Sequence, residues 1–366
     1  MSTKLKYKLG EHPDLPAPNT SKGAVHWLKV NLFSNWYNTI LTILAGYFLV
    51  RYLPSAFDWL FFSADFFTKS RAECTSGGAC WGVITSRWPQ YMYGFYPSEL
   101  YWRPNLAFVL LIVALVPLLY SVPHRKKMIA FSLVYPLIAF WLLWGGFGLE
   151  PVESAKMGGL MLTVMLGVMG IGLSLPVGIL LALGRRSEMP VIKTFCVIFI
   201  EFIRGVPMIS LLFMATVLLP LFLPSDIIID QLIRVIFIVV IFSSAYIAEV
   251  VRGGLQAIPK GQYEAGAVMG LSYWQSMNLI ILPQALKISI PGIVNSFIGL
   301  FKDTTLVIIV GMFDLLGVGR AALSNKQWIG LANEVYMFIA LMFFIFCYSM
   351  AIYSLKLEKR LSTSHK

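Results

Sequence analysis

The chain has 366 residues, of which 58% are hydrophobic and only 13% are charged. A soluble domain carries about 25% charged residues, and a mean hydropathy of +0.74 lies far outside that class. Several uncharged runs approach or exceed the roughly 20 residues that cross a bilayer. The composition therefore indicates an integral membrane protein, with the lipid bilayer as its first partner, and excludes a soluble enzyme.

The formal net charge of +11 raises the question of nucleic-acid binding. The basic residues do not gather in one patch, however, but stand at the ends of the hydrophobic runs. The positive-inside rule predicts this distribution for cytoplasmic loops. We therefore expect the charge to set membrane topology, with no nucleic-acid partner.

The N-terminal segment, residues 1–36, is polar and lysine-rich and lacks the apolar core of a signal peptide. We expect it to be a cytoplasmic leader. The first predicted span covers residues 38–53, and a polar, aromatic loop follows. Within that loop, residues 57–67 (FDWLFFSADFF) have the tryptophan and phenylalanines that favour the membrane interface.

The sequence has four cysteines, two of them in the loop motif CTSGGAC. If this loop faces an oxidising compartment, Cys74 and Cys80 can form a disulfide. Two free thiols are the other interpretation, and the sequence leaves both open. Cys196 and Cys347 lie in hydrophobic segments and are expected to pack as small apolar residues. The histidines are scattered, so no metal site is predicted.

The second, third and fourth predicted spans cover residues 105–122, 128–146 and 157–183. The motif EFIRGVP then places a proline where it should break a helix. We therefore predict an amphipathic elbow up to Arg204 and a fifth span over 206–222. The remaining spans are predicted at 232–250, 291–310 and 335–354.

These segments predict an all-α integral membrane protein with about eight transmembrane helices. Both termini are expected on the cytoplasmic side because the short connections on that side are basic. The basic residues concerned are Arg125, Lys126, Lys127, Arg185, Arg186, Arg252, Lys260 and Lys287. Four parts are predicted: the leader, a three-helix extension with an outer loop (37–156), a five-helix core (157–356) and a cytoplasmic tail (357–366).

Residues 264–286, EAGAVMGLSYWQSMNLIILPQAL, interrupt the hydrophobicity of the predicted core. We expect a short exposed helix, with Glu264 near its start, where the helix dipole favours a carboxylate, and Gly270 at its left-handed end. A second stretch is expected to stop at Leu282-Pro283. The alternative is an ordinary connecting loop, but connections between bundled helices usually run only about 2–8 residues.

The pattern E-A-x4-G-x9-I-x-L-P in this segment resembles the EAA loop of permease subunits of binding-protein-dependent ABC importers. Gly266 stands where that family has its second alanine. The resemblance implies a coupling helix that docks in a groove of a cytoplasmic ATPase. It assigns this role to Gly261, Gln262, Tyr263, Glu264, Ala265, Gly266, Ala267, Gly270, Leu282 and Pro283.

Neighbouring motifs narrow the resemblance. EFIRGVP, SAYIAEVVRGGLQAIPKGQYEAG and LPQALKISIPGIVNSFIGLFKDTTLV look like the polar amino-acid branch, and the three additional N-terminal spans look like its general L-amino-acid permeases. The resemblance implies a bacterial inner-membrane subunit that works with a homologous permease, a cytoplasmic ABC ATPase dimer and a periplasmic amino-acid-binding protein.

The sequence contains no G-x4-G-K-[ST] motif, so ATP and magnesium are expected on the ATPase chain. We expect no cofactor and no catalysis on this chain. The alternative is an ion-gradient-driven secondary transporter or channel. That class predicts broken helices in both halves, whereas the predicted breaks fall only in the C-terminal part.

Two groups of charges fall within or beside predicted spans. Lys302, Asp303, Thr304 and Thr305 could line a substrate path, with the carboxylate facing the ammonium of an amino acid; a structural ion pair is the alternative. The motif E-x-x-R-G occurs twice, with Glu201 and Arg204, and with Glu249 and Arg252. These four residues could form a gating network at the cytoplasmic mouth, or simply pair and snorkel at helix ends.

Overall fold

The computed structural model describes residues 23–120, 123–224 and 226–362, so most of the predicted leader and the end of the predicted tail lie outside it. The chain divides into two compact units. The first comprises Met1–Asp65 with Cys74–Ala79, and the second comprises Phe66–Glu73 with Cys80–Lys366. Regular structure in the described residues is helical except for a short strand, β1 (Phe313–Asp314).

The first unit contains α1 (Ala24–Asn31) and α2 (Trp36–Phe57), which continues into a π-helix at Asp58–Phe62. The prediction that this span ends at residue 53 is wrong, because the helix continues through Pro54 for two more turns. Membrane helices tolerate proline when local π adjustments satisfy the freed backbone groups. Residues 57–62 are therefore helical, and only the remainder of 57–67 is irregular.

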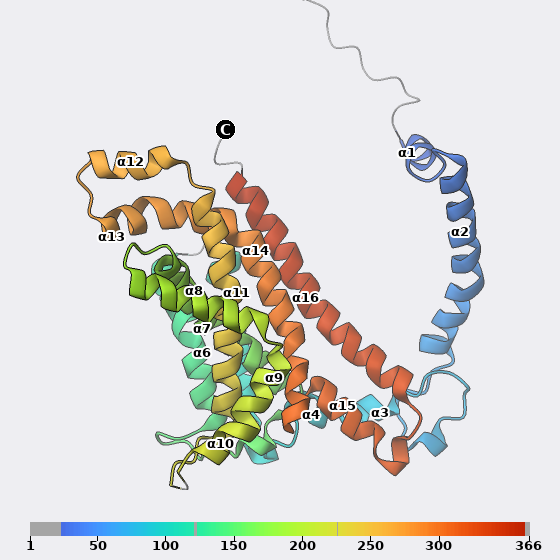
Figure 1. The fold of residues 1–366 in the computed structure, drawn as a ribbon. Coiled ribbons are helices and arrows are strands. Elements are labelled where there is room, and N and C mark those ends of the chain that lie inside the picture. The colour runs from blue at the N-terminus through green and yellow to red at the C-terminus, as the bar shows by residue number, and fades with distance from the viewer. Residues whose placement is uncertain (1–22, 121–122, 225, 363–366) are drawn as a thin grey trace, which may run out of the picture. The chain divides into compact units, whose positions relative to one another are not determined.

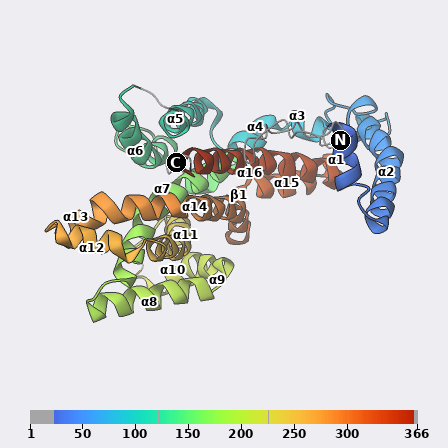
Figure 2. The same ribbon diagram turned by 90° about the horizontal axis from the view of Figure 1, so that it is seen from above.

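The second unit holds the other helices (Figures 1 and 2). Their bounds are α3 Gly82–Thr85, α4 Trp88–Tyr93, α5 Trp102–Leu119, α6 Arg125–Trp144, α7 Gly159–Arg185, α8 Pro190–Gly205, α9 Met208–Phe213, α10 Leu219–Phe222, α11 Gln231–Gln256, α12 Lys260–Val268, α13 Tyr273–Ser276, α14 Leu282–Asp303, α15 Leu315–Leu323 and α16 Ala332–Ser362.

Within the described residues of the whole chain, seven helices are long and apolar enough to cross a membrane. An eighth span exists if Pro190–Gly205 and Met208–Phe222, which meet at a bend of 102°, are counted together. The predicted elbow before Pro207 is confirmed. Helix α8 packs on α7 and α11, and the chain then turns sharply into α9.

The prediction that Pro283 interrupts the chain is wrong. A π-helix at Met277–Ile281 leads directly into α14, so one helical segment runs from residue 273 to residue 310. Pro283 directly follows this π-helix, and such local π adjustments satisfy the backbone groups that a proline frees. The short helix α15 has no counterpart among the predicted spans.

Helix α7 forms the centre of the second unit and packs most extensively on α11. At Gly178 a Cβ would lie 2.7 Å from the Ile247 side chain, and at Gly170 one would lie 2.7 Å from Leu300. Small residues at such positions let membrane helices approach closely. The buried core around these contacts includes Leu162, Leu166, Leu212, Leu232 and Val239.

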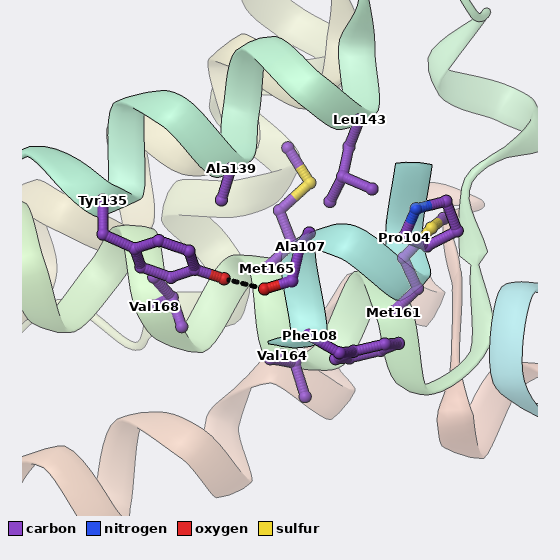
Figure 3. A pocket seen from close by; sticks show the side chains of 10 residues that line it. All are labelled: Pro104, Ala107, Phe108, Tyr135, Ala139, Leu143, Met161, Val164, Met165 and Val168. Atoms are coloured by element: carbon purple, nitrogen blue, oxygen red, sulfur yellow. Dashed lines mark hydrogen bonds between the residues drawn. The ribbon is translucent and has the colours of Figure 1, made fainter. Parts of the chain in front are cut away.

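Helices α5 and α6 pack against α7 in the same unit. The Tyr135 hydroxyl of α6 donates a hydrogen bond of 2.7 Å to the Ala107 carbonyl of α5 (Figure 3). The apolar cavity beside this bond has a volume of only about 10 Å³, about enough for one water molecule. It therefore reflects helix packing and cannot hold an amino acid. The predicted domain boundary at residue 156 stays a prediction.

The helix α15 lies at the end of the second unit opposite α12 (Figure 1), and Asp314, directly before it, is a fully buried carboxylate. Asp314 pairs with Gly159 in a parallel bridge, and its Oδ1 accepts a hydrogen bond of 2.8 Å from the Gly317 amide, which caps α15. Its Oδ2 has no hydrogen-bond partner among the described residues. Burial raises the pKa of Asp314 to about 6, although the backbone amides of the cap oppose the shift.

We expect Asp314→Asn to flatten the pH dependence of stability. Because the folded-state pKa lies above the ordinary 3.8, the native protein binds the proton more tightly than the unfolded chain does. Protonation of Asp314 therefore stabilises the folded state. This contribution is fully present below the unfolded pKa of 3.8 and is lost as the pH rises through about 6. Between pH 5 and pH 7.5 the free energy of unfolding of the wild type should fall by about 1–1.5 kcal/mol. Thermal unfolding in detergent measures this change.

The asparagine variant keeps an oxygen for the α15 cap but cannot ionise, so it should lack this loss. Asp226→Asn is the matched control, since Asp226 is exposed. It should keep the wild-type pH dependence. Identical pH profiles for Asp314→Asn and the wild type would contradict the assignment.

Candidate functional site

The interrupted segment forms α12, a tight turn and α13 at one end of the second unit (Figure 1). Gly270 has a φ of 70°, as predicted for the left-handed end of this helix. The Gly270 amide bonds to the Ala267 carbonyl at 3.0 Å, and the Leu271 amide bonds to the Gly266 carbonyl at 3.1 Å. This is the Schellman arrangement. Glu264, in contrast, lies mid-helix, so the predicted contribution of the helix dipole is wrong.

Three contacts anchor α12 to its neighbours. The Tyr263 hydroxyl donates to the Leu255 carbonyl at 3.1 Å, and the Gln284 amide donates to the Gln262 side-chain oxygen at 3.1 Å. Gly266 is buried, and a Cβ there would lie 2.5 Å from the Ser276 Oγ. The small residue therefore lets α12 lie directly on the segment that follows it.

The opposite side of α12 and α13 is exposed and apolar. The exposed fraction is 88% for Val268, 71% for Met269 and 58% for Trp274. On the Tyr263 side, an open cavity of about 450 Å³ lies between α12 and the ends of α7 and α11. Its lining includes Arg186, Lys260, Tyr263 and Glu264. Contiguous apolar residues exposed at a helix end are typical of an interaction surface.

A network of charges joins the ends of α7, α8 and α11, close to α12. Its centre is Glu249, which accepts hydrogen bonds from Arg185 at 3.2 Å and from the Arg252 Nε at 3.0 Å. Arg204 lies 3.9 Å away, and Arg185 also pairs with Glu201 at 2.8 Å. We call these five residues the Glu249 network. The structure thus brings together the four charges of the two E-x-x-R-G motifs.

Arg185 is the member that sequence reasoning missed, since it was interpreted only as a topology signal. Its side chain is 20% exposed, compared with 23% for Glu249 and 54% for Glu201. Arg204 stacks over the Tyr246 ring at 5.6 Å, and its buried Nε has no partner among the described residues. Three arginines therefore share two carboxylates.

Residues 302–305 end α14 and begin a 3-10 helix. Thr304 is fully buried and its hydroxyl donates to the Phe301 carbonyl at 2.8 Å, while Thr305 donates to the Lys302 carbonyl at 2.9 Å. Both hydroxyls are therefore occupied by their own helix. Lys302 is exposed and Asp303 is half-buried, so the two charges do not face the same direction.

Three further residues complete the comparison with the sequence. Arg234 of α11 donates to the Thr216 carbonyl at 2.8 Å and to the Ala215 carbonyl at 3.3 Å, within the π-helix after α9. No motif identified this residue in advance. Cys74 and Cys80 are both disulfide-bonded in the structure.

Comparison with known proteins gives consistent matches. Residues 174–363 match the family described as binding-protein-dependent transport system inner membrane component. An inner membrane amino-acid ABC transporter permease of Escherichia coli, YhdY, is 50% identical over 96% of this chain and 97% of its own length. The Rhodobacter capsulatus glutamate/glutamine/aspartate/asparagine transport system permease BztC is 43% identical, with 96% of each chain covered.

Among solved structures, an amino acid ABC transporter crystallised with histidines shares 29% sequence identity with this chain. The match covers 55% of this chain and 92% of that one, with a TM-score of 0.49.

Proposed function

The chain belongs to the family of binding-protein-dependent transport system inner membrane components and is an amino-acid ABC transporter permease; we propose that it couples to a cytoplasmic ATPase through α12. A homologous permease completes the translocation path, and a periplasmic protein delivers the amino acid. ATP and magnesium bind to the ATPase dimer. The chain lies in a bacterial inner membrane with both termini in the cytoplasm.

The observation that carries the coupling role is the construction of α12. One side is fixed to α11 and α14 by Tyr263 and Gln262, and the other exposes Val268 and Met269. A helix that only connected two spans would need neither feature. An exposed helix anchored in this way can receive a force from a partner and pass it to the membrane helices.

For the substrate path, Asp303 is the candidate that we keep from residues 302–305. Ionisable groups at membrane depth cost about 2.5–3.5 kcal/mol on insertion scales, so they face protein partners or water. A half-buried carboxylate at the end of α14 can receive the ammonium group of an amino acid. The threonine hydroxyls already bond to carbonyls of their own helix, so we assign them no direct contact.

The Glu249 network is proposed as a gate between the ends of α7, α8 and α11. Its contacts join three helices at the α12 end, so a change in their spacing must break some of them. The unequal number of arginines and glutamates leaves one guanidinium without a full partner. An arginine of this network can therefore move from one glutamate to the other while each carboxylate keeps an arginine partner.

Co-purification tests the proposed assembly. The tagged full-length chain, expressed with its natural neighbours and extracted in mild detergent, should retain a second permease and an ATPase. After reconstitution in proteoliposomes, amino-acid uptake should require ATP inside and the binding protein outside. Uptake by the chain alone, driven by an ion gradient, would instead support a secondary transporter.

A further inference from the structure

We propose that the C-terminal end of α7, residues Gly184 and Arg185 with the cap residue Arg186, transmits movement of α12 to the Glu249 network. This inference rests on the proposed function, because it concerns how the coupling helix acts on the membrane helices. Two neighbouring arginines make the two contacts that this transmission needs. Arg186 contacts α12, and Arg185 contacts the two glutamates of the network.

Arg186 forms the contact with the coupling helix. Its Nη1 donates to the Tyr263 hydroxyl at 2.8 Å and to the Leu255 carbonyl at 3.0 Å. The guanidinium also lies 5.3 Å from the centre of the Tyr263 ring. Because the same hydroxyl donates to Leu255, Tyr263 is held at one point by both α7 and α11. A displacement of α12 must therefore move Arg186 or break this group of contacts.

Arg185 forms the contact with the network. Its two terminal nitrogens reach Glu201 of α8 at 2.8 Å and Glu249 of α11 at 3.2 Å. Arg185 is the last residue of α7, and Arg186 is its cap, whose amide bonds back to the Leu183 carbonyl at 3.1 Å. The two side chains contact different neighbours and share this turn. Any rotation or shift of this turn changes both sets of contacts together.

The packing around the turn favours transmission of the movement. At Gly184 a Cβ would lie 2.5 Å from the Cys196 Sγ, so α7 and α8 are already in close contact here. On the other side, the cavity of about 450 Å³ lined by Arg186, Tyr263 and Glu264 leaves α12 room to move. Open space thus adjoins α12, and close packing joins α7 to α8 of the network.

This proposal makes Tyr263 a positioning residue rather than part of the surface that the ATPase touches. Tyr263→Phe removes one hydroxyl and keeps the ring, so helix packing should be preserved. Tyr348→Phe on α16 is the matched control, because Tyr348 is 55% exposed and lies on another helix. Arg186→Gln tests the other side of the contact.

The readout is amino-acid uptake per ATP hydrolysed by the complete complex in proteoliposomes, with partner permease, ATPase and binding protein. Tyr263→Phe removes the hydroxyl's two hydrogen bonds, to Arg186 and to Leu255, and should lower this ratio by about tenfold. Arg186→Gln should lower it at least as much, and Tyr348→Phe should leave it unchanged. If Arg186→Gln fails to assemble, the result for Tyr263→Phe decides.

A double variant separates transmission from simple structural damage. If Tyr263 and Arg185 act in series, Tyr263→Phe combined with Arg185→Gln should be no worse than the more severe single variant. Independent effects would multiply, and that result would overturn the proposal. A Tyr263→Phe complex with the ratio of the Tyr348→Phe control would overturn it as well. A wild-type chain that retains no ATPase would contradict the proposed function itself.

Discussion

Glu249→Gln is expected to stop most uptake and to lower the free energy of unfolding by about 1.5–3 kcal/mol, the contribution of hydrogen bonds to charged groups. Glu249 is the only carboxylate in the Glu249 network that contacts three arginines, namely Arg185, Arg204 and Arg252. A neutral amide leaves these guanidiniums to repel one another. Uptake in proteoliposomes and thermal unfolding in detergent measure the two effects.

Glu201→Gln is the matched control for this change. Glu201 forms one ion pair, with Arg185, and its side chain is 54% exposed. Exposed ion pairs contribute about 0–1 kcal/mol, so the control should be much milder. Equal losses in the two variants would show that Glu249 is not the centre of the network. Rescue of Glu249→Arg by Arg204→Glu would support a direct interaction between the two motifs.

Gly270→Ala is expected to disturb coupling more than its small size suggests. With a φ of 70°, residue 270 lies in the left-handed region, which costs a residue with a Cβ about 1–2 kcal/mol. No atom would obstruct the new Cβ, so the effect is one of backbone conformation alone. We expect the end of α12 to rearrange and ATPase retention and uptake to fall about tenfold.

Gly299→Ala in α14 offers the same substitution at an ordinary φ and outside the coupling segment. Space around it is also open, and alanine favours a helix by about 1 kcal/mol over glycine. This variant should assemble and transport at least as well as the wild type. Full activity in both variants would remove the argument that the Gly270 turn presents α12 to its partner.

Much of the helical architecture could be predicted, because long apolar runs bounded by basic residues leave few alternatives. Boundaries failed mainly at prolines. Pro54, Pro283 and Pro291 all lie within helices, although proline in water would end them. In a membrane the backbone must remain bonded, so π-turns and helix continuation are favoured over a break.

The exposed helix α12 and its glycine turn could be predicted from a local pattern, because the turn depends on residues close in sequence. Four of the five residues of the Glu249 network were predicted to come together, and Arg185, which lies 64 positions from Glu249, was not. A pair of arginines after a span is equally consistent with topology alone. Only the crossing of α7, α8 and α11 shows that one of them contacts carboxylates and the other contacts α12.

The close contact between Gly266 and Ser276 changes how the resemblance of the EAA segment should be interpreted. Glycine in place of the family's second alanine looks neutral in an alignment, yet here the missing methyl group is the space that Ser276 occupies. The two positions are therefore coupled through volume. A chain that restores alanine at 266 must make room at 276, so evolutionary change at one position should be accompanied by change at the other.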